Sequence, residues 1–474
     1  MSNKLSLSAS DRINALLDDS SFVEVGAYVT ARSTDFNMQE NDTPKDGVIT
    51  GYGVVNGKLV YVYSQDASVM GGAIGEMHAK KIARLYDMAI KVGAPVVGFI
   101  DCAGLRLQEA TDALNAFGEL YLKQTLASGV VPQITAVFGN CGGGAAIIPA
   151  MSDFTFMTSE NSKLFVNSPN AFAGNNTSKL DTASADYVSK NSAMVDRVCE
   201  DDMAVIGEIK NLLEILPSNN CDMDINDTND DPNRCIPNLD SFANNSRAML
   251  SNIADGNEFF ELGESFAKEV VIGLIKLNGM TIGCVANQVE DGNNMMSADG
   301  ALRAADFVKM CDSFNIPVLT VVNTKGFEAT MANEKFISDA VAKLAYSFAN
   351  ATVPKITLIT GDAFGTAYTI MNSKSLGADV VYAWPNAKIG TMDPEMAVKI
   401  MYENEINSAS DKVAKLNELK AEYTHLQSSA LAAAKRGYVD DIIEPDATRK
   451  RLIAAFDMMY TKQEDRPYKK HGTI

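Results

Sequence analysis

The stretch VPQITAVFGNCGGGAAIIPAM, residues 131–151, reads as a buried strand, a glycine turn and a helix. The apolar run Ile134–Phe138 is typical of a strand inside a sheet. After three intervening residues come Gly142, Gly143 and Gly144, which stand immediately before another apolar run. Without Cβ atoms, their N–H groups can come close to a ligand, and the first amides of the next helix point the same way. Two such amides can hold a developing oxyanion, although a tight packing turn would have the same composition.

Three landmarks in this half of the chain recur at one spacing, which predicts an internal duplication. A single offset of 222 in residue number relates the two copies of each: Asn56–Val60 and Asn278–Ile282, Ala94–Val97 and Ile316–Leu319, Val131–Thr135 and Val353–Thr357. A fourth pair, Phe22–Gly26 and Phe259–Gly263, needs an offset of 237. The first half therefore carries an insertion, which we assign to the polar stretch 37–45.

The duplication also repeats the glycine turn. The same offset of 222 carries Gly143 and Gly144 onto Gly365 and Thr366, again after an apolar strand, Ile356–Thr360. Two equivalent turns that present amides favour two oxyanion sites in one enzyme over a packing role alone.

Apolar strand patterns alternate with helical patterns in each half. Leu59–Tyr63 and Val96–Ile100 read as strands, and Glu76–Val92 has apolar residues at helical spacing. This order predicts α/β layers in two domains, residues 1–235 and 236–474, which meet in the polar linker 219–245.

Composition excludes several function classes. The 474 residues are 46% hydrophobic and 21% charged, which is typical of a globular chain of two or three domains. A net charge of −19 argues against nucleic-acid binding and mainly favours solubility. Seven scattered Cys predict reduced thiols, and Met1–Ser10 lacks an apolar signal core, so a cytoplasmic protein is expected.

No metal site is expected. Asp222, Asp224 and Asn226 could begin a calcium loop, but its sixth and twelfth positions hold Asp227 and Asn233 in place of the required Gly and Glu.

Side chains for acid–base catalysis are scarce. There are three His, of which His78 lies on a predicted helix and is best explained as structural, and His471 lies in a basic tail. There is no nucleophile elbow and no Walker loop. An enzyme of this kind would work mainly through backbone dipoles, as in enolate chemistry on a thioester. A hydratase or isomerase would need a Glu near the first turn, for which Glu109 and Glu119 are candidates.

Over nearly its whole length the chain resembles the biotin-dependent acyl-CoA carboxyltransferases, both propionyl-CoA carboxylase β subunits and α subunits of sodium-pumping acyl-CoA decarboxylases. The matching stretches include Asp46–Gly51, Tyr63–Asp66 with Gly71 and Gly72, Ser128–Gln133, Asp153–Met157, Phe314–Pro317, Ala351–Lys355, Leu376–Asp379, Tyr382–Pro385 and Arg436–Ile443.

The resemblance implies a duplicated crotonase-like fold of ββα superhelical domains, with the acyl-CoA side in the first domain and the biotin side in the second. It implies that Gly143 and Gly144 hold the thioester enolate, and that Thr366 and Ala367 stabilise the biotin ureido oxyanion. This alignment sits one position beyond the repeat offset, so Gly365 stays among the catalytic candidates. The implied substrate-binding residues are Gly71, Gly72, Gly104, Gly142, Phe327, Tyr368 and Thr369.

The chain departs from the family at positions that bear on the substrate. The family usually reads Asp-Ser-Gly-Gly-Ala-Arg at Asp101–Arg106, Pro-Gly-Phe-Leu-Pro-Gly at Lys325–Thr330, and Gly-Gly-Ala-Tyr at Gly365–Tyr368. The position after that Tyr, often acidic and linked to acyl preference, is Thr369. These departures leave the acyl group open.

Partners follow from what the sequence lacks. It has no ATP-binding loop and no Ala-Met-Lys-Met biotin site, so biotin is expected on a carrier protein, served by a biotin carboxylase subunit or by membrane decarboxylase pump subunits. The family resemblance also implies a homo-oligomer, a hexamer built as a trimer of dimers. The alternatives that remain are a decarboxylase α subunit of the methylmalonyl-CoA or glutaconyl-CoA type, a biotin-independent hydratase or isomerase of the crotonase type, and a non-catalytic assembly subunit.

Overall fold

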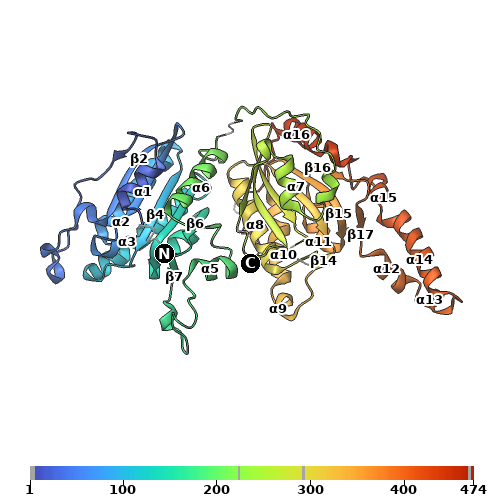
Figure 1. The fold of residues 1–474 in the computed structure, drawn as a ribbon, viewed down its shortest axis with the longest axis horizontal. Helices are drawn as coiled ribbons and strands as arrows, with labels where there is room; N and C mark the ends of the chain where they lie inside the picture. The colour runs from blue at the N-terminus through green and yellow to red at the C-terminus, as the bar shows by residue number, and fades with distance from the viewer. Residues whose placement is uncertain (1–5, 223–224, 291–293, 468–470, 474) are drawn as a thin grey trace. The chain divides into compact units, whose positions relative to one another are not determined.

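The computed structural model describes residues 6–222, 225–290, 294–467 and 471–473, and the chain divides into two compact units. Unit 1 is Met1–Met223 and unit 2 is Asp224–Ile474 (Figure 1). The division between the units lies within the predicted linker 219–245, before the domain boundary proposed between residues 235 and 236. Asp224, one of the residues considered for a calcium loop, lies outside the described residues.

Unit 1 is built on one mixed sheet with the strand order β1-β2-β3-β4-β5-β6-β8, and β7 pairs with the end of β5. The first three strands are antiparallel and the pairs from β3 onward are parallel. The strands are β1 (Val23–Glu24), β2 (Val48–Val55), β3 (Lys58–Gln65), β4 (Val96–Cys102), β5 (Gln133–Gly142), β6 (Phe154–Thr158), β7 (Lys163–Phe165) and β8 (Arg197–Cys199).

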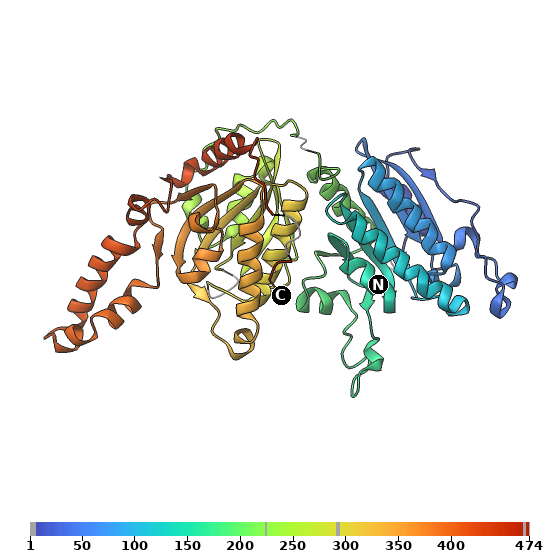
Figure 2. The same cartoon turned by 180° about the vertical axis from the view of Figure 1, so that it is seen from behind.

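Two long helices cover one face of this sheet, and the view from behind shows them side by side (Figure 2). One of them spans Glu76–Val92 as predicted, buries its apolar side and ends at Gly93, whose left-handed conformation caps the last turn. The helices of unit 1 are α1 (Ala9–Leu16), α2 (Glu76–Val92), α3 (Ala110–Ala127), α4 (Ile147–Ala150), α5 (Ala185–Asn191) and α6 (Asp202–Ile215).

Unit 2 repeats this sheet with the order β9-β10-β11-β13-β15-β16-β18, and β17 pairs with the end of β15. The strands are β9 (Phe259–Leu262), β10 (Val270–Leu277), β11 (Met280–Asn287), β13 (Val318–Thr324), β15 (Lys355–Phe364), β16 (Val380–Ala383), β17 (Lys388–Gly390) and β18 (Asp441–Ile442). A separate two-stranded sheet pairs β12 (Met295–Met296) with β14 (Gly326–Phe327).

The helices of unit 2 include a pair that matches α2 and α3, and an arm that extends from the sheet (Figure 1). The matching pair is α8 (Ala298–Ser313) and α10 (Ile337–Asn350), and the arm comprises α12 (Pro394–Met401), α13 (Glu403–Ser408) and α14 (Lys412–Tyr423). The others are α7 (Ser246–Ile253), α9 (Met331–Glu334), α11 (Gly365–Ile370), α15 (Ala430–Lys435) and α16 (Thr448–Met459).

Strand register confirms the duplication residue by residue. The partners Val48–Gln65 and Val96–Gln133 in unit 1 recur as Val270–Asn287 and Val318–Lys355 in unit 2, each shifted by 222. Val23 pairs with Tyr52, and Phe260 pairs with Leu274, which reproduces the larger offset at the first strand. The insertion in unit 1 forms the loop between β1 and β2, with short 3₁₀ helices at Asp35–Glu40 and Pro44–Gly47.

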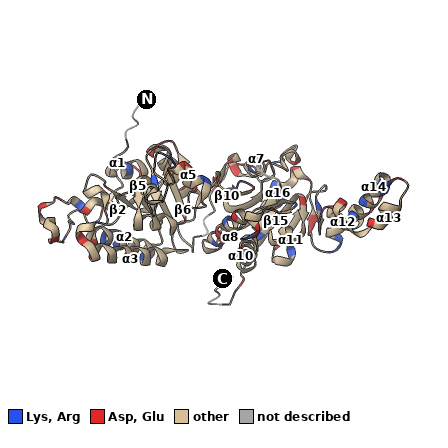
Figure 3. Cartoon of the chain, turned by 90° about the horizontal axis from the view of Figure 1, so that it is seen from below, with Lys and Arg blue, Asp and Glu red and all other residues tan. Residues whose placement is uncertain are grey.

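Within the described ranges, no helix is both long and apolar enough to cross a bilayer. Basic and acidic residues are interspersed along both units (Figure 3).

Candidate active site

The first glycine turn closes strand β5 and starts a helix. Gly143 has φ +62°, a left-handed conformation that favours glycine, and the chain continues as a 3₁₀ turn at Gly143–Ala146 before α4. A Cβ added to Gly143 would meet no heavy atom within 4 Å, so this side of the turn is open. The strand, turn and helix predicted from the sequence are therefore present, with the turn backbone accessible.

The glycines on either side of Gly143 are closely packed. A Cβ on Gly142 would lie 2.9 Å from the ring of Phe165, and a Cβ on Gly144 would lie 3.1 Å from Tyr121 Oη. Packing therefore contributes to the choice of glycine at both positions.

Two more predicted site residues lie at the same end of the sheet. Ala103 N–H donates to the Gly71 carbonyl at 2.9 Å, and a Cβ on Gly104 would lie 3.2 Å from the Gly142 carbonyl oxygen. Gly104 thus borders the turn, and Gly71 lies beside the neighbouring Ala103. Gly72 has a packing constraint of its own, since an added Cβ would lie 2.1 Å from the Asp101 carbonyl oxygen.

The second turn closes β15 in unit 2. Gly365 also has φ +62°, and α11 begins there, which leaves its first amides without partners inside the helix. Thr366 is exposed, whereas Ala367 is buried. Because Gly142 and Phe364 also share an extended conformation, with φ −113° and −114°, the structural repeat pairs Gly144 with Thr366.

Three further predicted residues lie near this turn. Thr369 Oγ1 donates to the Gly365 carbonyl at 3.4 Å, and burial raises the pKa of Tyr368 to about 12, so its hydroxyl stays protonated. Phe327 belongs to β14, which lies against α11.

Both turns rest on the same hydrogen-bonded support, which the sequence did not reveal. In unit 1 the side chain of Gln65 accepts from Asp101 N–H at 3.2 Å, and the Asp101 carboxylate accepts from Asn140 N–H. These bonds fix the ends of β4 and β5 just before the turn.

Unit 2 has the equivalent bonds with changed side chains. Asn287 Oδ1 accepts from Asn323 N–H at 3.1 Å, and Asn323 Oδ1 accepts from Asp362 N–H at 3.0 Å. Each residue lies 222 positions after its counterpart. Aligning the two halves places Gln65 opposite Asn287, and this match of two amide side chains is the sequence feature that could have predicted the support.

A buried charged cluster supports unit 1 beside the site. Arg106 donates to Asp46 at 2.5 Å and to Glu109 at 2.8 Å, and all three side chains are almost fully buried. Glu109 also accepts from Glu76 N–H at 2.6 Å. Glu109 is thus committed to an ion pair and is not a free base, while Glu119 lies half-buried in the middle of α3.

His78 connects this cluster to the strand ends. Its Nδ1 lies 2.9 Å from the Asp46 carbonyl oxygen, which can only accept, so Nδ1 carries the proton and Nε2 accepts from Gln65 Nε2 at 3.1 Å. Burial, and then the charge of Arg106, lower the pKa of His78 to about 3. His78 is therefore neutral at physiological pH and is engaged in structure.

Comparison with known proteins identifies the family. The sequence model of the protein family described as the carboxyl transferase domain matches residues 3–474. The chain belongs to the carboxyl transferase family. It is 40% identical to the methylmalonyl-CoA decarboxylase subunit alpha of Propionigenium modestum, with 99% of this chain and 93% of that protein covered. It is 38% identical to the mitochondrial propionyl-CoA carboxylase beta chain of Homo sapiens, with 99% and 88% covered.

The solved structure of transcarboxylase 12S, a hexamer with methylmalonyl-CoA bound, superposes with a TM-score of 0.94 at 36% identity, covering 98% of this chain and 92% of that one. These relatives confirm the resemblance to biotin-dependent acyl-CoA carboxyltransferases and the α/β, duplicated crotonase-like fold.

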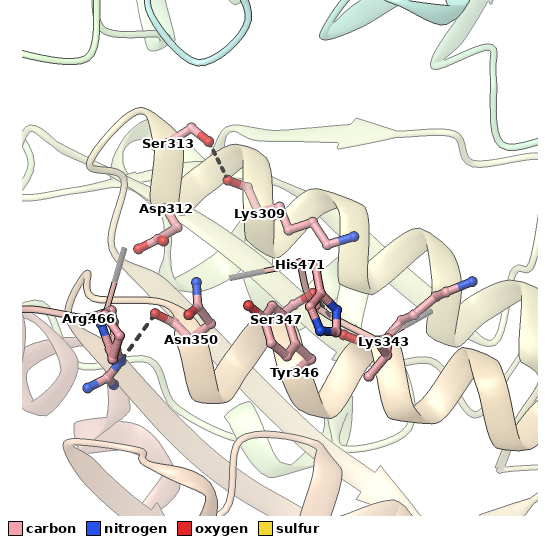
Figure 4. Close-up of a pocket in the computed structure, with 12 residues that line it drawn as sticks. Lys309, Asp312, Ser313, Lys343, Tyr346, Ser347, Asn350, Arg466 and His471 are labelled. Carbon is pink, nitrogen blue, oxygen red and sulfur yellow. Dashed lines mark hydrogen bonds between the residues drawn. The ribbon is translucent and has the colours of Figure 1, made fainter. Parts of the chain in front are cut away.

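A cavity of about 460 Å³ lies elsewhere in unit 2, between α8, α10 and the C-terminal segment (Figure 4). Its lysines, Lys309 and Lys343, pair with Asp306 and Asp339, and no predicted site residue lines it. Among the described residues, no group of three or more His, Cys, Asp or Glu side chains could hold a metal ion.

Proposed function

We propose that this carboxyltransferase moves a carboxyl group between an acyl-CoA, bound by unit 1, and biotin carried on a partner protein, bound by unit 2. The observation that carries the proposal is the pair of equivalent turns, at Gly143–Gly144 and Gly365–Ala367, which end equivalent strands in the two units. A carboxyl transfer between two acceptors develops negative charge on an oxygen of each, and two preorganised pairs of amides match that need.

At the first turn, the N–H groups of Gly143 and Gly144 would hold the thioester oxygen of the acyl-CoA as the enolate forms. The open space beside Gly143 supports this role because the ligand oxygen must come within hydrogen-bond distance of the amides. Gly71, Gly104 and Gly142 would border the bound acyl group.

At the second turn, the N–H groups of Thr366 and Ala367 would donate to the ureido oxygen of biotin, with Gly365 providing the bend. The residues fit such a group, since α11 begins there and its first amides have no partner within the helix. Phe327, Tyr368 and Thr369 would border this second ligand.

The names of the relatives point to one acyl pair. Methylmalonyl-CoA is the substrate named for the decarboxylase, and propionyl-CoA, its decarboxylated counterpart, is named for the carboxylase. We therefore propose the methylmalonyl-CoA and propionyl-CoA pair. The direction of transfer would depend on the partners, either a biotin carboxylase subunit or membrane pump subunits that accept from the carrier.

The test is transfer of the labelled free carboxyl carbon of methylmalonyl-CoA to biotin, without ATP. We expect label on free biotin or a biotinyl carrier and formation of propionyl-CoA in equal amount. Hydration of an enoyl-CoA without biotin-dependent transfer would instead support the hydratase alternative, and absence of both activities would support an assembly role.

The hexamer seen in transcarboxylase 12S supports a homo-oligomer here. Because transfer needs the two turns close together, we propose that one protomer's unit 1 faces another's unit 2. Light scattering at low protein concentration should therefore give a mass several times the 51.0 kDa of one chain. A fully active monomer would contradict the shared-site arrangement.

A further inference from the structure

A phenol side chain contacts the backbone of the first turn directly. Tyr121, on α3, donates its hydroxyl to the Gly144 carbonyl at 2.8 Å. The same carbonyl accepts the N–H of Ile147 at the start of α4, so both of its lone pairs are used. Burial raises the pKa of Tyr121, which keeps the hydroxyl in its protonated, donating form.

The packing around Gly144 shows that this contact is a close fit. A Cβ on Gly144 would lie 3.1 Å from Tyr121 Oη and 3.4 Å from the ring of Phe117. The two rings lie 6.0 Å apart and cover one side of the turn, whereas a Cβ on Gly143 would meet nothing within 4 Å. The turn therefore has one braced side and one open side.

The second turn lacks this brace. The buried residues of α3 recur in α10 at an offset of 224, as in Leu120 and Leu344, so the positions equivalent to Phe117 and Tyr121 hold Val341 and Ala345, which carry no hydroxyl. At the place of Gly144 stands Thr366, which carries an exposed side chain. A side chain at this position occurs in the unit without the tyrosine, and glycine occurs in the unit with it.

We propose that Tyr121 is a positioning residue of the first turn, whose hydroxyl holds the Gly144 peptide so that the turn amides stay aimed at the thioester oxygen. Consecutive glycines have wide backbone freedom, and an oxyanion site is effective only when its donors need not reorient. The inference rests on the proposed function, because it assigns Tyr121 to the acyl-CoA turn and not to the biotin turn.

The test is Tyr121→Phe, which removes only the hydroxyl. We expect kcat for carboxyl transfer to fall by roughly tenfold, in line with the loss of one hydrogen bond, while the KM for acyl-CoA stays within about threefold. The matched control is Tyr52→Phe, which removes a hydroxyl from a half-buried tyrosine on β2 of the same unit and should leave kcat unchanged. An unchanged kcat in Tyr121→Phe would overturn the proposal, even if the melting temperature fell.

A double-mutant cycle provides the second test. Gly144→Ala places a Cβ against Tyr121 Oη, so its effect on kcat should be at least several-fold smaller in the Tyr121→Phe background than in the native enzyme. Equal effects in the two backgrounds would show that the hydroxyl and Gly144 do not act together, and would overturn the proposal.

Failure of this inference is distinguishable from failure of the proposed function. If Gly143→Val abolishes transfer but Tyr121→Phe has no effect, the turn is catalytic and Tyr121 does not position it. If Gly143→Val is itself active, the assignment of the turn to the thioester fails, and the positioning role fails with it.

Discussion

Gly143 and Gly365 share one left-handed backbone conformation, with φ +62° at each, although they belong to different halves of the chain. Each follows the last residue of an equivalent strand, β5 in unit 1 and β15 in unit 2. The two halves have thus kept the backbone conformation that presents the amides, while the next residue differs, being Gly144 in unit 1 and Thr366 in unit 2. This division between a preserved backbone and changed side chains is what a two-substrate enzyme built by duplication requires.

Gly143→Val should abolish carboxyl transfer while the protein stays folded. The space beside Gly143 accommodates a Cβ, but a branched residue at φ +62° is strained and would occupy the open side that we propose for the thioester. Loss of one oxyanion donor costs roughly 3 kcal/mol of transition-state stabilisation. Exchange of label between methylmalonyl-CoA and biotin measures the effect.

The control for backbone strain is Gly57→Val, in the turn between β2 and β3. Gly57 has φ +78° and equally open surroundings, so the strain is matched while the site is untouched. Carboxyl transfer by Gly57→Val should remain near the native rate. Transfer by Gly143→Val within threefold of native would remove this turn from the thioester site.

Arg106→Met should destabilise unit 1 strongly. The substitution leaves Asp46 and Glu109 buried beside each other without their shared cation, and breaking a buried ion pair in this way costs about 3–5 kcal/mol. Urea unfolding followed by circular dichroism measures the loss. Arg32→Met removes an exposed pair with Glu76 and should cost less than about 1 kcal/mol, and a similar cost for both variants would contradict the argument.

Asp153→Asn should change how stability depends on pH. Burial raises the pKa of Asp153 to about 7, assisted by nearby Asp196 and opposed by the Gln133 N–H. Because the folded pKa lies above the unfolded value of 3.8, this group's stabilising contribution is complete below pH 4 and is lost as pH rises through 7.

The variant keeps an oxygen acceptor for Gln133 N–H but has no proton to lose. Its melting temperature should therefore fall less than that of the native protein between pH 5 and pH 8. The counterpart Asp379 forms an ion pair with Lys462 at 2.8 Å. Asp379→Asn therefore removes a favourable charge, and its melting temperature should not fall less than that of the native protein between pH 5 and pH 8. Parallel pH profiles for Asp153→Asn and the native protein would refute the titration of Asp153.

Local pattern was enough to predict the elements that form the candidate site. The apolar period identified the helix Glu76–Val92, and the repeat spacing located the second turn at Gly365, because strands and their register were duplicated together. The sequence could not reveal contacts between distant residues. Arg106 pairs with Asp46 and Tyr121 pairs with Gly144 across long stretches of chain, and no periodicity links them. Packing determines such pairs, and only the folded chain shows them.

Thr366→Pro should stop carboxyl transfer but leave binding of the CoA ester within about fivefold, as measured by calorimetry. Proline removes the Thr366 N–H, one of the two donors assigned to the ureido oxygen of biotin, and disfavours the left-handed conformation of the preceding Gly365. Thr366 is exposed at the start of α11, where proline is tolerated, so the fold should persist.

Thr366→Ala keeps the N–H and should retain much more activity than Thr366→Pro, since the backbone and not the hydroxyl is the proposed donor. Equal losses in the two variants would show that the side chain matters instead. If Thr366→Pro weakened CoA-ester binding as much as it weakened transfer, the acyl-CoA would belong at the second turn, and the assignment of the two units would have to be reversed.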